Sequence, residues 1–182
     1  AIYVGNGELD AGITGRDLLI DSAANAKEIL SLEFGRSTFR FAAPDKSGLT
    51  EKDLANKRIA TAYPGLLKNY LESKNLNAEI VSLDGAVESA IRLGVADVIA
   101  DVVSTGGTLR QAGLSVFGEP LLTSEAVLIS RNNQSNSPQL DVLIRRLSGV
   151  VIAKQYVLMD YDVESKLLEN CLLYTSDAAD DT

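Results

Sequence analysis

Five consecutive residues, each a serine, a threonine or a glycine, form the part of this chain best suited to chemistry, and one acidic residue precedes them. The apolar run of residues 98–103 predicts a buried strand that carries Asp101 near its C-terminal end. The loop residues after it are Ser104, Thr105, Gly106, Gly107 and Thr108. Backbone N–H groups of such a loop can converge on an anion at the start of a helix. Because Asp101 would repel a phosphate, we expect it to face sugar hydroxyls or a metal ion. The pattern indicates a phosphorylated sugar, although an ordinary strand-to-helix turn would show the same residues.

The composition excludes several kinds of catalysis. The chain has 182 residues, of which 46 % are hydrophobic and 23 % charged, as in ordinary globular proteins. It contains no histidine, so Ser-His-Asp catalysis, Cys-His catalysis and the commonest zinc sites are ruled out. An enzyme of this composition must use carboxylates, hydroxyls, backbone amides, Lys and Arg, and a hard metal such as Mg²⁺ is compatible with these groups.

Charge and hydropathy limit the expected partners and location. The net charge of −8 argues against a nucleic-acid partner, which would need a basic surface. No apolar run approaches the ~20 residues of a membrane helix, so we expect no membrane partner. The single cysteine, Cys171, excludes an internal disulfide and is compatible with a reducing cytosol. We therefore expect a cytoplasmic protein.

Alternating strands and helices must position the loop. Hydrophobic periodicity predicts strands at residues 9–14, 29–32, 38–43, 58–62, 78–83, 98–103 and 125–130. It predicts helices at residues 16–24, 66–74, 85–93 and, for the most part, 137–163, whereas residues 116–122 are expected to be a connector. Thr50 and Asp53 have the spacing of a helix cap. This order indicates an α/β protein with largely parallel sheets.

A second loop has a similar pattern. A strand, then Thr-Gly, then a helix occurs at Thr14-Gly15 and again at Thr105-Gly106. Ligands of open α/β sheets bind at the carboxyl ends of strands, where both loops are expected. The two loops, facing each other across a cleft, would form a two-sided anion site.

Five stretches follow one another along the chain: YVGNGELDAGITGRD at residues 3–17, ATAYP at 60–64, GAVE at 85–88, DVVSTGGTL at 101–109 and SEAVLI at 124–129. Together they resemble the ATP phosphoribosyltransferase family, and the resemblance is colinear over about residues 1–171. Residues 151–162 are similar to the segment before the regulatory domain of the family's long form. The loop also resembles the signature of the other major phosphoribosyltransferase fold, but Ala100 stands where that fold usually has a second acid. Ile91 departs from the family, which usually has a proline there.

The resemblance implies an α/β fold of two lobes, similar to type II periplasmic binding proteins, with mixed, largely parallel sheets and a cleft between the lobes. Lobe one would comprise residues 1–39 and 122–171, and lobe two residues 40–121. The family's opening β-α unit, with its Lys- and Arg-bearing loop, and the C-terminal regulatory domain are expected to be missing. Residues 172–182 lose the amphipathic pattern, and we expect them to be a non-native tail.

The implied reaction joins N1 of ATP to C1 of phosphoribosyl pyrophosphate and releases pyrophosphate, as the first step of histidine biosynthesis. It needs positioning, Mg²⁺ and electrostatic stabilisation, and no residue is expected to act as an acid, a base or a nucleophile. On the phosphoribosyl side, Asp101 would bind the ribose hydroxyls and residues 104–108 the 5′-phosphate. The expected ATP-side residues are Arg16, Asp17, Tyr63 and Glu88. The intact long form is expected to be a homo-oligomer, a hexamer.

Each ATP-side residue also has a structural interpretation. Arg16 could be a solvated residue of a first helical turn, and Asp17 could simply stabilise the N-terminus of the same helix. Tyr63 could pack in a turn instead of stacking on adenine, and Glu88 could be a surface carboxylate. The rival function is a non-catalytic two-lobed binding protein for a small phosphorylated ligand.

Overall fold

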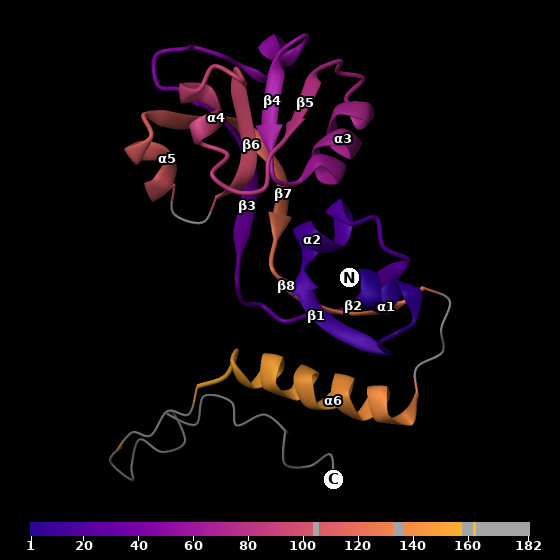
Figure 1. Cartoon of the computed structure of the whole chain (residues 1–182). Coiled ribbons are helices and arrows are strands. Elements are labelled where there is room, and N and C mark those ends of the chain that lie inside the picture. The colour runs from indigo at the N-terminus through magenta and orange to yellow at the C-terminus, as the bar shows by residue number, and fades with distance from the viewer. Residues whose placement is uncertain (104–105, 133–136, 158–161, 163–182) are drawn as a thin grey trace.

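Two β-sheets, one in each lobe, organise the chain (Figure 1). The computed structural model describes residues 1–103, 106–132, 137–157 and 162. In lobe one the strand order is β1-β8-β2, and both strand pairs are antiparallel. These strands are β1 (Ala11–Gly15), β2 (Ala26–Ser31) and β8 (Ala126–Arg131). The short helices α1 (Ile2–Asn6) and α2 (Arg16–Asp21) belong to this lobe.

Lobe two contains a mixed sheet of order β5-β4-β6-β3-β7. Its strands are β3 (Ser37–Pro44), β4 (Arg58–Thr61), β5 (Glu79–Ser82), β6 (Val98–Val103) and β7 (Leu114–Ser124). In the described chain, parallel pairing is confined to β5-β4-β6, and β3 pairs antiparallel with both β6 and β7. The helical elements are η1 (Glu51–Leu54), α3 (Pro64–Ser73), α4 (Ser89–Arg92) and α5 (Gly107–Gln111). The predicted α/β class with mixed sheets is confirmed, but the prediction that the sheets are largely parallel is wrong. Among the described strands most pairs are antiparallel, because β8 runs back alongside β1 and β2, and β6 and β7 run back alongside β3.

Alternation along β3 divides the core of lobe two into two layers. Phe39 and Phe41 are fully buried on one face of the sheet, in a cluster with leucines of α3. Ala42 belongs to the other layer, where it packs with Ile99 and Leu109. Successive side chains of a strand point to opposite faces of the sheet. The β3 residues that stand two or four positions before Ala42 therefore lie on the same face as Ala42. This second face carries the candidate site.

Strands β3 and β7 run from lobe two toward lobe one (Figure 1). Ser37 and Ser124 are paired at the end of this ladder nearest lobe one. The boundaries expected after residues 39 and 121 fall inside these two continuous strands, and the division into lobes at those residues stays a prediction.

The predicted connector at residues 116–122 is wrong, because β7 continues through it. Gly118 and Pro120 suggested a loop, but β7 is the edge strand of its sheet, where proline is tolerated. A bulge accommodates the extra residues, since Phe39 pairs with Leu122 whereas Phe41 pairs with Phe117.

Three helices are shorter than predicted. The helix expected at residues 16–24 ends at Asp21, as α2. The helix expected at residues 85–93 is confined to α4 because Gly85 and Ala86 have φ values of 84° and 47°, outside the helical region. The helix expected from residue 137 is α6 (Pro138–Ala153), whose N-terminus is capped by the Ser137 hydroxyl. The capping box predicted from Thr50 is present, although it begins the 3₁₀ helix η1. No described helix has the length and apolarity to span a membrane.

Candidate functional site

A small cavity of about 150 Å³, which we call the phosphate-loop pocket, lies where β6 ends and α5 begins. Its lining residues come from α5, β6 and the segment before α4: Glu88, Asp101, Val102, Val103, Gly106, Gly107, Thr108 and Leu109. Gly106 has a φ of 69°, a left-handed conformation that favours glycine, and it forms the N-cap of α5. No described side chain caps this helix, and the first N–H groups of a helix have no partner within the helix itself, so they can donate to an acceptor.

Two carboxylates share this pocket. Asp101 is half-buried, and its Oδ1 accepts a hydrogen bond from the Val102 amide at 2.7 Å. Burial raises the pKa of Asp101 above its usual value, the Val102 hydrogen bond opposes this shift, and the nearby charge of Glu88 raises the pKa further. The half-buried Asp101 carboxylate accepts one hydrogen bond from the described chain, and this bond does not offset the cost of burying its charge. Such a carboxylate is suited to accept hydrogen bonds from hydroxyls of a bound ligand.

Tyr63 lies at the junction of the two lobes. It precedes Pro64 at the start of α3, and its ring packs edge-on against Phe39 with centroids 5.6 Å apart. Burial raises the pKa of its hydroxyl, and the carboxylates of Asp17, Asp101 and Asp21 raise it further, in that order. The pKa of the Tyr63 hydroxyl is therefore affected by the charges of acidic groups in both lobes.

Asp17 is buried beneath the end of β7. Its Oδ1 accepts a hydrogen bond from the Ser124 hydroxyl at 2.9 Å, and the Ser124 oxygen accepts one from the Asp17 amide at 3.0 Å. Only 7 % of Asp17 is exposed. This reciprocal pair fixes the first turn of α2 to the strand that links the lobes.

Arg16 is engaged within lobe one. Its guanidinium donates to both oxygens of Glu28 at 2.8 Å and to Glu125 at 3.1 Å, and Nη1 reaches the Thr123 carbonyl at 3.4 Å. The Glu28 hydrogen bonds are the largest cause of a raised pKa for Arg16, and they lower the pKa of Glu28. A phosphate would have to compete with two carboxylates for this guanidinium.

The structure brings together some of the predicted site residues. Five of them line the phosphate-loop pocket, namely Glu88, Asp101, Gly106, Gly107 and Thr108. Glu88, expected on the ATP side, therefore lies beside the phosphoribosyl residues, whereas Arg16 is held by Glu28 and Glu125. Ser104 and Thr105 lie outside the described residues.

Sequence reasoning gave no role to two residues that support this region. Asp21 acts across the lobes, since its Oδ1 accepts a hydrogen bond from the Leu66 amide at 3.1 Å. Ser124 holds Asp17. Ser124 begins one of the five stretches of resemblance, and this was the available signal for it. Asp21 had none, because its partner is 45 residues away.

The described carboxylates can hold a metal ion only together with a ligand. Among the described residues, no group of three or more His, Cys, Asp or Glu side chains could hold a metal ion. Mg²⁺ is usually bound by one or two carboxylates together with substrate phosphates. Asp101 and Glu88 form such a pair beside the loop, so the donor set fits Mg²⁺ that arrives with a phosphorylated ligand.

Comparisons with known proteins agree on one family. The family model described as ATP phosphoribosyltransferase matches residues 1–149. An ATP phosphoribosyltransferase of Kocuria rhizophila is 60 % identical over 168 residues, covering 92 % of this chain and 60 % of that protein. The chain spans about 60 to 63 % of the length of such curated relatives.

Solved structures agree with the sequence match. The ATP phosphoribosyl transferase (HisG:HisZ) complex from Thermotoga maritima has a TM-score of 0.71 at 26 % identity, covering 83 % of this chain and 74 % of that chain. A periplasmic binding protein of an arginine transport system from Legionella pneumophila has a TM-score of 0.58 at 14 % identity, covering 84 % and 70 % of the two chains. This second likeness concerns the fold alone and confirms the two-lobed class. With the family model matching most of its length, the chain belongs to the ATP phosphoribosyltransferase family.

Proposed function

We propose that this chain forms the substrate-binding part of an ATP phosphoribosyltransferase that carries out the first step of histidine biosynthesis. N1 of the adenine of ATP attacks C1 of phosphoribosyl pyrophosphate, the bond from C1 to the pyrophosphate oxygen breaks, and pyrophosphate leaves with the electron pair. Family membership supports this reaction. The observation that carries it is the phosphate-loop pocket, in which Gly106, Gly107 and Thr108 at the start of α5 lie next to the half-buried carboxylate of Asp101.

The phosphoribosyl half of the substrate occupies this pocket in our proposal. The 5′-phosphate accepts hydrogen bonds from the amides of Gly106, Gly107 and Thr108, and Ser104 and Thr105 complete the loop. Asp101 accepts hydrogen bonds from the ribose hydroxyls. The reaction passes through a positively charged ribosyl centre, so nearby carboxylates favour it and no covalent intermediate is needed.

ATP approaches from the junction of the lobes. Tyr63 offers a ring for the adenine, and Asp17 orients the first turn of α2 through Ser124. Arg16 binds a phosphate of the nucleotide only if that phosphate displaces Glu28 or Glu125 from its guanidinium. Glu88 lies between the positions proposed for the two substrates.

Mg²⁺ is the proposed cofactor, and Asp101 and Glu88 would hold it. When bound, it neutralises the charge that develops on the leaving pyrophosphate. The whole protein is proposed to be a cytoplasmic homo-oligomer, a hexamer in the long form.

A chimera tests this function. The matched region of the Kocuria rhizophila relative is replaced by this chain, and pyrophosphate release from ATP and phosphoribosyl pyrophosphate is measured. We expect release that depends on both substrates and on Mg²⁺. The same chimera carrying Asp101→Asn should lose about tenfold to a hundredfold in kcat/KM, because a hydrogen bond to a charged group contributes about 1.5–3 kcal/mol.

The rival binding function predicts a different pattern. A non-catalytic binding protein would bind phosphoribosyl pyrophosphate with a normal affinity and release no pyrophosphate. A folded chimera that behaves in this way would exclude the transferase.

A further inference from the structure

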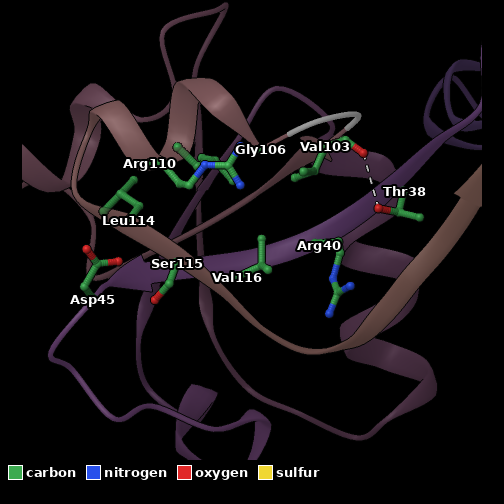
Figure 2. A pocket seen from close by; sticks show the side chains of 10 residues that line it. Thr38, Arg40, Asp45, Val103, Gly106, Arg110, Leu114, Ser115 and Val116 are labelled. Carbon is green, nitrogen blue, oxygen red and sulfur yellow. Dashed lines mark hydrogen bonds between the residues drawn. The ribbon is translucent and has the colours of Figure 1, made fainter.

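A second and larger cavity, of about 550 Å³, lies between β3, α5 and the start of β7 (Figure 2). We call it the arginine pocket. Thr38 and Arg40 of β3 line one side, Leu109 and Arg110 of α5 cover it, and Val116 of β7 completes the wall. Its volume is in the range of small-molecule sites, and it meets the phosphate-loop pocket at the end of β6 and the start of α5. Of the described residues that are proposed for the substrates, only Gly106 lines it.

Arg40 is half-buried and has few partners among the described residues. Its Nη2 donates to the carbonyl of Gly118 in the β7 bulge, which is a neutral acceptor. Its Nε is buried and has no acceptor among the described residues. Within the same part of the chain it forms no ion pair, although Asp101 is its cross-strand partner in the β3–β6 ladder. A buried N–H without an acceptor is costly, and next to a cavity it indicates a ligand.

Arg110 contributes a second guanidinium from the opposite wall. Its side chain extends from α5 toward Gly106 (Figure 2), and its Nη1 lies 3.8 Å from the point where a Cβ on Gly106 would stand. The pocket's one acidic lining residue, Asp45, lies at the other end of the pocket from Arg40 (Figure 2). The pocket thus has a positive end in a protein whose net charge is −8.

We propose that the arginine pocket is a separate binding site for a diphosphate group. Guanidinium groups present planar pairs of donors that match phosphate oxygens, and two of them on facing walls suit two linked phosphates better than one. Val103, Leu109 and Leu114 give the pocket partly apolar walls, next to which charge-assisted hydrogen bonds are stronger than in open solvent. Free pyrophosphate and the diphosphate of a nucleotide share this chemistry. The site would let a diphosphate bind close to the phosphate loop without occupying it.

Calorimetric titration of the 182-residue chain with inorganic pyrophosphate tests the site, with ribose 5-phosphate as a probe of the phosphate loop. Arg40→Gln and Arg110→Gln should each weaken pyrophosphate binding in the arginine pocket by about tenfold, the loss expected for one charged hydrogen bond. Neither variant should change the affinity for ribose 5-phosphate. Arg92→Gln, an exposed arginine of α4 outside the pocket, is the matched control and should bind both ligands as the unaltered chain does.

Two results would overturn the proposal. Unchanged pyrophosphate binding in folded Arg110→Gln protein would do so, and this variant is safe for folding because Arg110 is exposed on a short helix. An equal loss of ribose 5-phosphate and pyrophosphate binding would also do so, because the arginines would then act through the loop. Titration with uridine diphosphate distinguishes free pyrophosphate from the diphosphate of a nucleotide as the ligand. If uridine diphosphate binds more tightly than pyrophosphate, the ligand is a nucleotide. These binding results are independent of whether the chimera catalyses the transfer.

Discussion

The carboxylate of Asp101 lies half-buried in the phosphate-loop pocket, with Glu88 beside it. Its raised pKa means that the folded protein binds the Asp101 proton more tightly than the unfolded chain does. The free energy of unfolding therefore decreases as the pH rises from the unfolded pKa of Asp101 through its folded pKa, and the full penalty is present at neutral pH. The ionised carboxylate of Asp101 therefore lowers the free energy of unfolding at neutral pH.

We expect Asp101→Asn to raise the free energy of unfolding at pH 7 by up to about 1 kcal/mol, because it removes the buried charge and keeps an oxygen for the Val102 amide. The same variant should bind phosphoribosyl pyrophosphate about tenfold to a hundredfold more weakly. Thermal unfolding and ligand titration of one protein sample measure both effects. The gain in stability should disappear at acidic pH, where the wild-type carboxyl is protonated. A loss of stability at pH 7 would contradict the assignment of Asp101 as a ligand-binding group held against its own burial cost.

Prediction from sequence was strongest for residues that act through their neighbours along the chain. The loop at residues 106–108 was recognised because its glycines and hydroxyls are consecutive, and Thr50 because its capping partner is three residues away. The partners of Arg16 were not predictable, since Glu28 and Glu125 come from other strands of lobe one. Arg40 was missed for the same reason, because only the β3–β6 ladder sets it opposite Asp101.

At the scale of elements, an ion pair fixes the start of β4 to the turn before β6. Arg58 Nη2 lies 2.8 Å from Asp97 Oδ1, Asp97 Oδ2 accepts the Arg58 amide hydrogen bond at 3.0 Å, and Arg58 Nη1 donates to the Gly94 carbonyl. The hydrogen bonds from Arg58 lower the pKa of Asp97 to about 2. Because a lowered pKa stabilises the fold above the unfolded pKa, this contribution is lost as the pH falls from about 4 toward 2.

Asp97→Asn should therefore lower Tm at pH 7 by about 1–3 °C, a modest effect because both side chains are more than a third exposed. The difference from the unaltered chain should shrink as the pH falls below about 4. Thermal scans across this range measure it. A difference that stays constant with pH would show that the carboxylate charge does not contribute.

The contact between α2 and α3 depends on one glycine. A Cβ on Gly65 would collide with the backbone oxygen of Asp21, whose carboxylate also accepts the Leu66 amide hydrogen bond. We expect Gly65→Ala to push the two helices apart and to lower the free energy of unfolding by about 1–3 kcal/mol. Gly149→Ala in α6 is the matched control, because a Cβ there meets nothing within 4 Å. It should be neutral or stabilising by up to about 1 kcal/mol, as measured by denaturant unfolding.

Strand β7 shows where element prediction fails for a physical reason. Local composition, with Gly118 and Pro120 close together, favours a loop, but pairing with β3 determines the outcome. That pairing joins residues at least 70 positions apart, such as Pro44 and Leu114, and the bulge that accommodates the proline has no local signal. By contrast, the helical periodicity of Leu140, Ile144, Leu147 and Val151 correctly gave the less exposed face of α6.

At the scale of the whole molecule, the two lobes are tied together by strands and by a few buried hydrogen bonds. β3 and β7 provide the covalent links, and α2 contacts α3 through Asp21. The Asp17–Ser124 pair is the most buried of these ties, since Ser124 is only 2 % exposed. Because these contacts depend on both lobes being folded, we expect the chain to unfold in one cooperative thermal transition.

Ser124→Ala tests this coupling. The substitution leaves the buried Asp17 carboxylate and the Asp17 amide without their shared partner, so the free energy of unfolding should fall by about 1–3 kcal/mol. Ser115→Ala is the matched control, because Ser115 lies on the same strand but is exposed, and it should change stability by less than about 0.5 kcal/mol. Calorimetry of both variants gives the enthalpy and the shape of the transition. If Ser124 couples the lobes, its loss lowers Tm and broadens or splits the transition, whereas a shift equal to that of Ser115→Ala would mean that the strands alone hold the lobes together.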